Sequence, residues 1–258
     1  MTSRWAYEAL AVTQFKNNEY EKLFYPCEKA MSQSDYKKNY WIRTLRNKIT
    51  SIENGLTDKS KAEKVKSDLE VLRNEVTKEM THVKKISYKK ISKLYIEKVT
   101  TADLTELNEY LDVLNEYYVK KYNIANEAKD RLISSMTRTE DDKKKFVLLK
   151  KMFYNENLAD FCRNSSEVER VVEYNGQLYQ KIDPIFQDPD NKMIRSHFYA
   201  PRKQVFGLFF DTYWVNVIII WLMTITLYIT LYYKALKRLL DFMERMSEKV
   251  QKLGKKKE

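Results

Sequence analysis

Histidine and cysteine most often carry catalysis and metal binding, and this chain has only two of each. Neither His82 nor His197 belongs to an HExxH motif or stands near a cysteine at metal-ligand spacing. His82 falls in a charged, helical segment and His197 in a proline-rich one, so we expect both to be solvated or locally hydrogen-bonded. Cys27 and Cys162 would pair only in an oxidising compartment, and two independent thiols are the simpler interpretation of this possible disulfide.

Nucleotide chemistry has no motif here either. A phosphate-binding loop needs the pattern GxxxxGK[ST], and four scattered glycines do not supply it. Carboxylates stand beside lysines on helical faces, as in Glu75, Lys78 and Glu79, which is typical of solvated surface. We therefore expect no catalytic, cofactor-binding or metal site in this chain, and no enzyme activity.

The elements that would position any site are mainly helical. Glycine and proline number only four each, which disfavours turn-rich β folds and long flexible linkers. The spacing of hydrophobic residues and two capping boxes predict four helices. In each capping box the side chain of a Thr and that of an Asp three residues later accept hydrogen bonds from each other's backbone N–H groups. The expected helices run from Ser34 to Gly55, from about Asp58, from Thr100-x-x-Asp103 and from Thr139-x-x-Asp142. Short connections between them predict an antiparallel bundle within a domain of residues 16–182.

The pattern changes after this bundle. Asn175-Gly176 lies between β-prone segments, and both residues tolerate the positive φ of a type I′ turn, so we expect a hairpin at 168–182. Pro184, Pro189 and Pro201 then predict an irregular, rigid collar at 183–205.

One stretch, Tyr213 to Tyr233, contains no charged residue. At about 1.5 Å per residue it is long enough to cross a membrane as a helix, and a buried core helix is usually shorter. We expect a transmembrane helix at 206–235. Aromatic side chains cluster near its two ends, where an interfacial belt would lie, and Trp221 falls within the span. The expected span and interface residues are Phe206, Phe209, Phe210, Tyr213, Trp214, Trp221, Tyr232 and Tyr233.

The net charge of +11 is spread along the chain except in the tail after the span. Without an aromatic–basic motif, this charge does not indicate nucleic-acid binding. We expect residues 236–258 to form a basic, helical cytoplasmic tail near anionic lipid. That orientation places the large domain outside, yet Met1 to Val12 lacks the features of a signal peptide. Either the chain is tail-anchored with a cytosolic domain, or it is the last part of a longer membrane protein.

The first residues suggest the second alternative. Arg4, Trp5, Glu8, Leu10 and Phe15 stand in a stretch that resembles the one after the fifth membrane helix of White–Brown (G-type) ATP-binding cassette exporters. The ending, from Phe198-Tyr199-Ala200-Pro201 through Trp221-Leu222-Met223-Thr224, is similar to the close of the long fused exporters of this type in Bacteroidetes-like bacteria. Gln14 departs from the family's glutamate, and the loop between the two matching ends is far larger than usual.

This resemblance implies a re-entrant segment at 1–15 and the last span of a permease in the inner (cell) membrane. The large domain would be extracytoplasmic and the C-terminus cytoplasmic. The implied partners are the lipid bilayer, other transmembrane helices and an ATP-binding cassette domain of the same, dimeric transporter; ATP would bind that absent domain. Trp5, Glu8 and Phe15 would have structural roles. The alternative function is a self-contained single-span protein with a helical scaffold or sensor domain.

Overall fold

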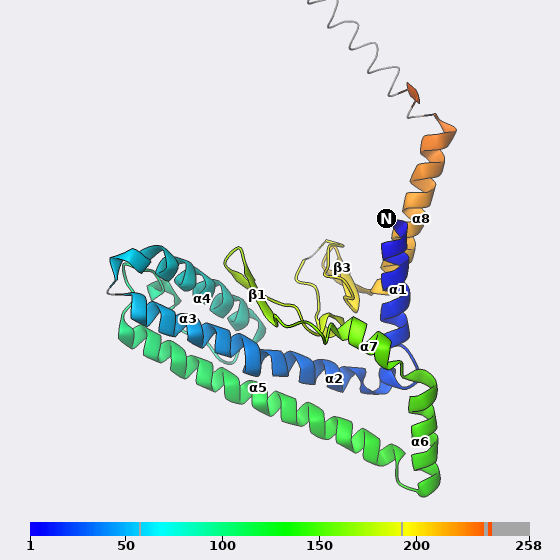
Figure 1. Ribbon diagram of the computed structural model, residues 1–258, viewed down its shortest axis with the longest axis horizontal. Coiled ribbons are helices and arrows are strands. Elements are labelled where there is room, and N and C mark those ends of the chain that lie inside the picture. Colours follow the sequence, from blue (N-terminus) through cyan, green and yellow to red (C-terminus); the bar gives the residue numbers. More distant parts are fainter. Residues whose placement is uncertain (57, 192, 235–236, 239–258) are drawn as a thin grey trace, which may run out of the picture.

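The computed structural model describes residues 1–56, 58–191, 193–234 and 237–238. Two elongated parts meet at a corner: a helical arm containing α2 to α5, and the apolar helix α8, which projects from one end of the arm (Figure 1). The expected class, mainly α with a bundle, a small hairpin and one C-terminal apolar helix, is confirmed.

The first long helix of the arm is formed by α2 (Glu21–Tyr36), a π-helical turn η1 (Lys37–Trp41) and α3 (Ile42–Gly55) without a break. The prediction that Ser34 starts this helix is wrong, because Ser34 lies inside it and its hydroxyl donates to the Ala30 carbonyl. The start is set by Asn18, whose side-chain oxygen accepts from the backbone N–H groups of residues 20 and 21. The predicted end at Gly55 is confirmed.

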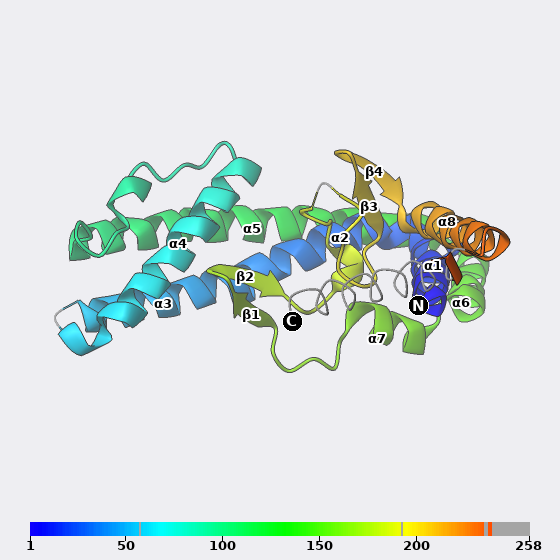
Figure 2. The same ribbon diagram turned by 90° about the horizontal axis from the view of Figure 1, so that it is seen from above.

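Two further helices complete the arm: α4 (Ala62–His82), after a 3₁₀ turn η2 (Lys59–Lys61), and α5 (Thr101–Met136). The chain reverses direction after α3, so α4 runs antiparallel to it. Residues 83–100, which include the 3₁₀ turn η3 (Ile91–Lys93), then carry the chain back along the arm, so α5 also runs antiparallel to α2 and α3 (Figures 1 and 2). The core between them is a continuous cluster of aliphatic and aromatic side chains, including Leu45, Ile49, Leu69, Leu72, Leu104, Leu107 and Leu111.

The remaining helices lie at the other end of the arm. Both α5 and α6 (Glu140–Phe153) begin at the predicted capping boxes. However, α6 has no buried residue and stands across the end of the arm, outside the bundle (Figure 1). A second, smaller core joins α1 (Thr2–Lys16), α2, α7 (Glu156–Arg163) and the 3₁₀ turn η4 (Pro184–Phe186).

Two antiparallel hairpins connect the arm to the apolar helix. The predicted one pairs β1 (Val171–Tyr174) with β2 (Gln177–Gln180), and Asn175 and Gly176 have φ of 49° and 66°. The second pairs β3 (Arg202–Val205) with β4 (Leu208–Asp211) around Phe206 and Gly207, with φ of 51° and 86°. The prediction of helix from residue 206 is therefore wrong, since residues 206–211 form a turn and a strand.

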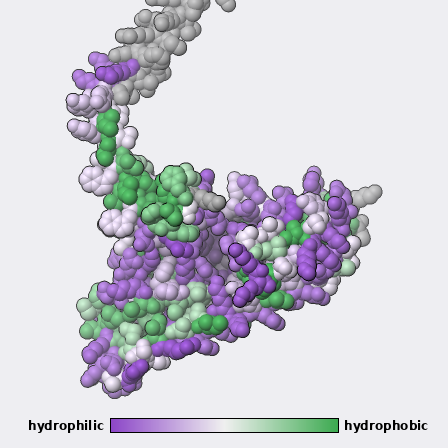
Figure 3. All heavy atoms as spheres, turned by 180° about the vertical axis from the view of Figure 1, so that it is seen from behind, coloured by the Kyte–Doolittle hydropathy of each residue, from purple (hydrophilic) through white to green (hydrophobic). Residues whose placement is uncertain are grey.

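The apolar helix α8 runs from Thr212 to Tyr232. It is long and apolar enough to cross a membrane, and only 11% of its most apolar window is buried. Figure 3 shows apolar side chains covering this projecting helix, with a largely hydrophilic surface over much of the arm. This exposure is unlike that of a core helix and is compatible with membrane association. Most of the predicted tail, 236–258, lies outside the described residues.

Candidate functional site

The N-terminal helix α1 packs antiparallel to the first turns of α8, and a buried ion pair lies at this junction. Lys203 Nζ donates to Glu8 Oε2 at 2.7 Å, and the two residues are only 2% and 3% exposed. Glu8 comes from α1 and Lys203 from β3. The pair therefore joins the first helix to the strand that leads into α8.

A third polar group completes this junction. Asn216, in the second turn of α8, donates its side-chain amide to Glu8 Oε2 at 2.8 Å and to the Trp5 carbonyl at 3.0 Å. The Lys203 ammonium also lies over the Trp5 ring, 4.4 Å from its centroid. Burial lowers the pKa of Lys203, and the hydrogen bond and charge of Glu8 oppose that shift. We call Glu8, Lys203 and Asn216 the junction triad.

The residues expected to match a re-entrant stretch divide between the two faces of α1. Glu8 and Phe15 are buried, and Trp5 packs against Lys203. Leu10 is 64% exposed, and Arg4 lies over the Phe198 ring in the collar, 5.3 Å from its centroid. Structural roles for Trp5, Glu8 and Phe15 agree with their contacts. The sequence did not indicate that Lys203 and Asn216 would join them.

The predicted membrane and interface aromatics are mostly exposed but do not share one helix. Phe206, Phe209 and Phe210 belong to the β3–β4 hairpin, whereas the others lie on α8 or directly after it. Within α8, the hydroxyls of Thr224, Thr226 and Thr230 donate to carbonyls of the preceding turn, so these hydroxyls are hydrogen-bonded within their own helix.

No family model, no curated protein and no solved structure matches this chain.

The structure places both thiols and shows the hydrogen bonding of one imidazole, that of His197. Cys27 and Cys162 are free thiols in this structure, Cys27 partly exposed and Cys162 buried in the smaller core. That burial raises the pKa of the Cys162 thiol to about 12. His197 Nε2 bonds the Pro184 carbonyl at 2.9 Å, and burial lowers its pKa. The prediction of local hydrogen bonding is confirmed for His197. Among the described residues, no cluster suited to a metal ion is found.

The arm contains a second polar assembly that the sequence did not reveal. Glu75 and Glu79, read from the sequence as solvated surface, are 3% and 1% exposed. Glu75 accepts from Trp41 Nε1 at 2.6 Å and from the Leu178 backbone at 2.8 Å, while Glu79 accepts from Lys37 and Tyr118.

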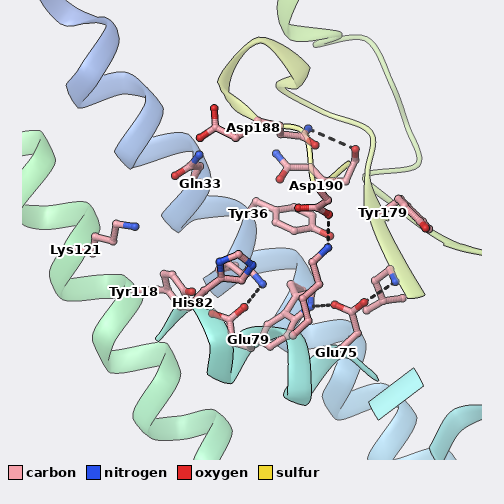
Figure 4. Close-up of a pocket in the computed structure, with 16 residues that line it drawn as sticks. Gln33, Tyr36, Glu75, Glu79, His82, Tyr118, Lys121, Tyr179, Asp188 and Asp190 are labelled. Atoms are coloured by element: carbon pink, nitrogen blue, oxygen red, sulfur yellow. Dashed lines mark hydrogen bonds and ion pairs between the residues drawn. The ribbon is translucent and has the colours of Figure 1, made fainter. Parts of the chain in front are cut away.

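These two carboxylates form one wall of an open pocket of about 340 Å³ (Figure 4). Lys37 and Trp41, which belong to the π-helical turn, line it, and π-helical turns frequently occur at functional positions. His82, Tyr36 and Asp190 point into the same space from three different segments (Figure 4). The pocket therefore lies where the bundle, the β1–β2 hairpin and the collar meet.

Proposed function

We propose that this chain is the C-terminal permease portion of an ATP-driven membrane exporter, comprising its last span and a large outer domain. The packing of α1 on α8 through the junction triad carries the proposal. It places a second helix at the level of the first turns of α8, as a re-entrant stretch before the last span would require. A single-span anchor needs no such companion.

Exposed apolar side chains supply further support. Tyr7 and Leu10 on α1 are 50% and 64% exposed, and α8 is exposed around most of its circumference. In an exporter these surfaces would contact lipid and the other membrane helices of a dimeric permease. ATP hydrolysis would belong to a cassette domain outside this chain.

The triad also gives the outer domain a mechanical role. Lys203 belongs to the collar, so a shift of α1 against α8 would move the collar with it. The collar in turn is bound to the arm: Tyr25 donates to the Ile185 carbonyl at 2.8 Å, and Lys29 bonds Asp188 at 2.6 Å. We propose that the arm, oriented to the outside of the inner membrane, covers or directs the exit of the transport path.

One observation favours the alternative, a single-span protein with a scaffold or sensor domain. The arm has its own continuous core and its own pocket, both independent of α8. In this alternative the arm would lie in the cytosol and bind a ligand or partner there.

Thiol labelling in intact cells separates the two functions. Cys27 is partly exposed and Cys162 is buried, so a membrane-impermeant maleimide should label Cys27 alone. Labelling before lysis is expected for the exporter, and labelling only after lysis would contradict it. A Cys27→Ser variant gives the background. The genomic region upstream adds an independent test: an open reading frame encoding GxxxxGK[ST] and further spans is expected, and a stop codon just before Met1 would refute the exporter.

A further inference from the structure

The tip of the β3–β4 hairpin carries an unusual residue for its backbone conformation. Phe206 has φ of 51° and its side chain is 84% exposed. A bulky residue in this left-handed region is strained, and type I′ turns favour Asn, Asp or Gly there. The other hairpin of this chain obeys that rule, with Asn175 at the equivalent position. Folding alone therefore gives no reason for an aromatic side chain at Phe206.

The rest of the hairpin continues this apolar surface. Leu208, Phe209 and Phe210 are 65%, 43% and 46% exposed, and residues 204–210 contain no charge. The charged groups gather at the base. There Arg202 bonds Asp188 through two nitrogens, Lys203 is held in the junction triad, and Asp211 pairs with Lys16. The hairpin is thus an apolar tip on a polar, rigid base.

This base fixes the hairpin to α8. Asp211 is the last residue of β4, and Thr212 begins the helix with its hydroxyl donating to the Ala200 carbonyl at 2.5 Å. The hairpin rises from that base toward the same side of the molecule as α8 (Figure 1). If α8 crosses a bilayer, its first turns and the hairpin tip meet the same leaflet.

We infer that the β3–β4 hairpin is a membrane wedge, whose tip around Phe206 inserts into the interfacial layer of the leaflet that surrounds the first turns of α8. The inference rests on the membrane span in the proposed function. Aromatic and aliphatic side chains are favoured at that depth, and burial in lipid compensates for the strained backbone at Phe206. The wedge would hold the collar, and through it the arm, at a fixed height above the membrane.

Spin labels report this depth directly. Single cysteines replace Phe206, Leu222 or Val147 in the full chain carrying Cys27→Ser and Cys162→Ala, reconstituted in phosphatidylcholine–phosphatidylglycerol vesicles. Leu222 lies within α8. Val147 is an exposed apolar residue on α6, which extends from the arm on the side opposite to α8 (Figure 1). For each nitroxide, relaxation by oxygen, which concentrates in lipid, is compared with relaxation by a water-soluble nickel chelate.

The label at position 206 is expected to be relaxed more by oxygen than by the nickel chelate. Its ratio of oxygen relaxation to nickel relaxation should lie between the ratios for the labels at Leu222 and Val147. A Phe206 label as open to nickel as the Val147 label would overturn the wedge while leaving the span intact. A Leu222 label open to nickel would overturn both the span and the wedge. In a second test the label replaces Leu208, and Phe206→Asn, which suits the turn better, is expected to remove its nickel protection. Protection retained in that variant would contradict the role of Phe206.

Discussion

Removal of one member of the buried Glu8–Lys203 pair tests whether the junction holds α1 to α8. Glu8→Gln keeps the side-chain volume and one acceptor but leaves the Lys203 ammonium buried without a counter-charge. Loss of one partner of a buried ion pair costs about 3–5 kcal/mol. Because the amide still accepts one hydrogen bond, we expect the lower end, about 3 kcal/mol. The Trp5 ring stays over the cation in both forms, so it does not alter this difference.

The same variant has a defined pH dependence. Burial already holds the pKa of Lys203 below its ordinary value of 10.5, and loss of Glu8 lowers that pKa further. The folded state then binds fewer protons than the unfolded state, so the free energy of unfolding rises with pH. The deficit of Glu8→Gln is therefore expected to be largest near neutral pH and to shrink as pH rises toward 10.5.

Urea unfolding of the detergent-solubilised chain, followed by tryptophan fluorescence, measures these differences. Adding Lys203→Met to Glu8→Gln removes both charges and should recover most of the loss, since uncharged replacements of a buried pair are often neutral. Asp211→Asn is the matched control. It breaks the exposed Lys16–Asp211 pair, which likewise joins α1 to the β3–β4 hairpin, and should cost no more than about 1 kcal/mol. Single-variant losses below about 1 kcal/mol, or strictly additive losses in the double variant, would refute the reasoning.

Three further outcomes follow from other parts of the chain. Burial and the neighbouring Glu28 raise the pKa of Glu21 to about 8 from an ordinary 4.5, so the free energy of unfolding should fall as pH rises through that interval. In melting curves recorded across this pH range, Glu21→Gln should reduce the loss of stability with pH, whereas Glu19→Gln, on the exposed surface, should not. Tyr118→Phe should cost about 1.5–3 kcal/mol in urea unfolding by removing a donor to buried Glu79, whereas Tyr117→Phe should be nearly neutral. Gly176→Val should lower the free energy of unfolding by about 1–2 kcal/mol, because a β-branched residue is strained in the left-handed turn and its Cβ would lie 3.2 Å from Asn74 Nδ2. An unchanged melting temperature would contradict this prediction.

Features set by neighbours in sequence could be predicted, and those set by distant partners could not. Thr100 with Asp103, and Asn175 with Gly176, determine their own local structure, and both appear where predicted. Lys203 and Glu8 are 195 residues apart, and no local pattern announces their contact. Glu75 and Glu79 were misread for the same reason: their lysine neighbours suggest a solvated face, while Trp41, Tyr118 and Leu178 reach them from other elements.

The start of the apolar helix was predicted wrongly for a different reason. Hydropathy locates the uncharged stretch correctly, but it does not distinguish a helix from a hairpin made of equally apolar residues. Residues 206–211 satisfy the requirement for interfacial aromatics in either form. The turn at Phe206 has only Gly207 as a signal, because its first position carries an aromatic side chain in place of the usual Asn.

The wrong prediction of where α8 begins and the failure to predict the Glu8–Lys203 pair have the same cause, the β3–β4 hairpin. Had α8 begun at residue 206, Lys203 would sit on the approach to a helix and Glu8 would lack its partner. The hairpin instead turns β3 back against α1, which brings the Lys203 ammonium to Glu8 and lets Asn216 close the third side. The strained turn at Phe206 and the buried charge of Glu8 therefore lie at the two ends of the same hairpin. Lipid contact would stabilise the strained turn, and Lys203 and Asn216 stabilise the buried carboxylate. Weakening the triad should accordingly change the depth of the hairpin tip, and the Phe206 spin label in a Glu8→Gln background is the measurement that links the two.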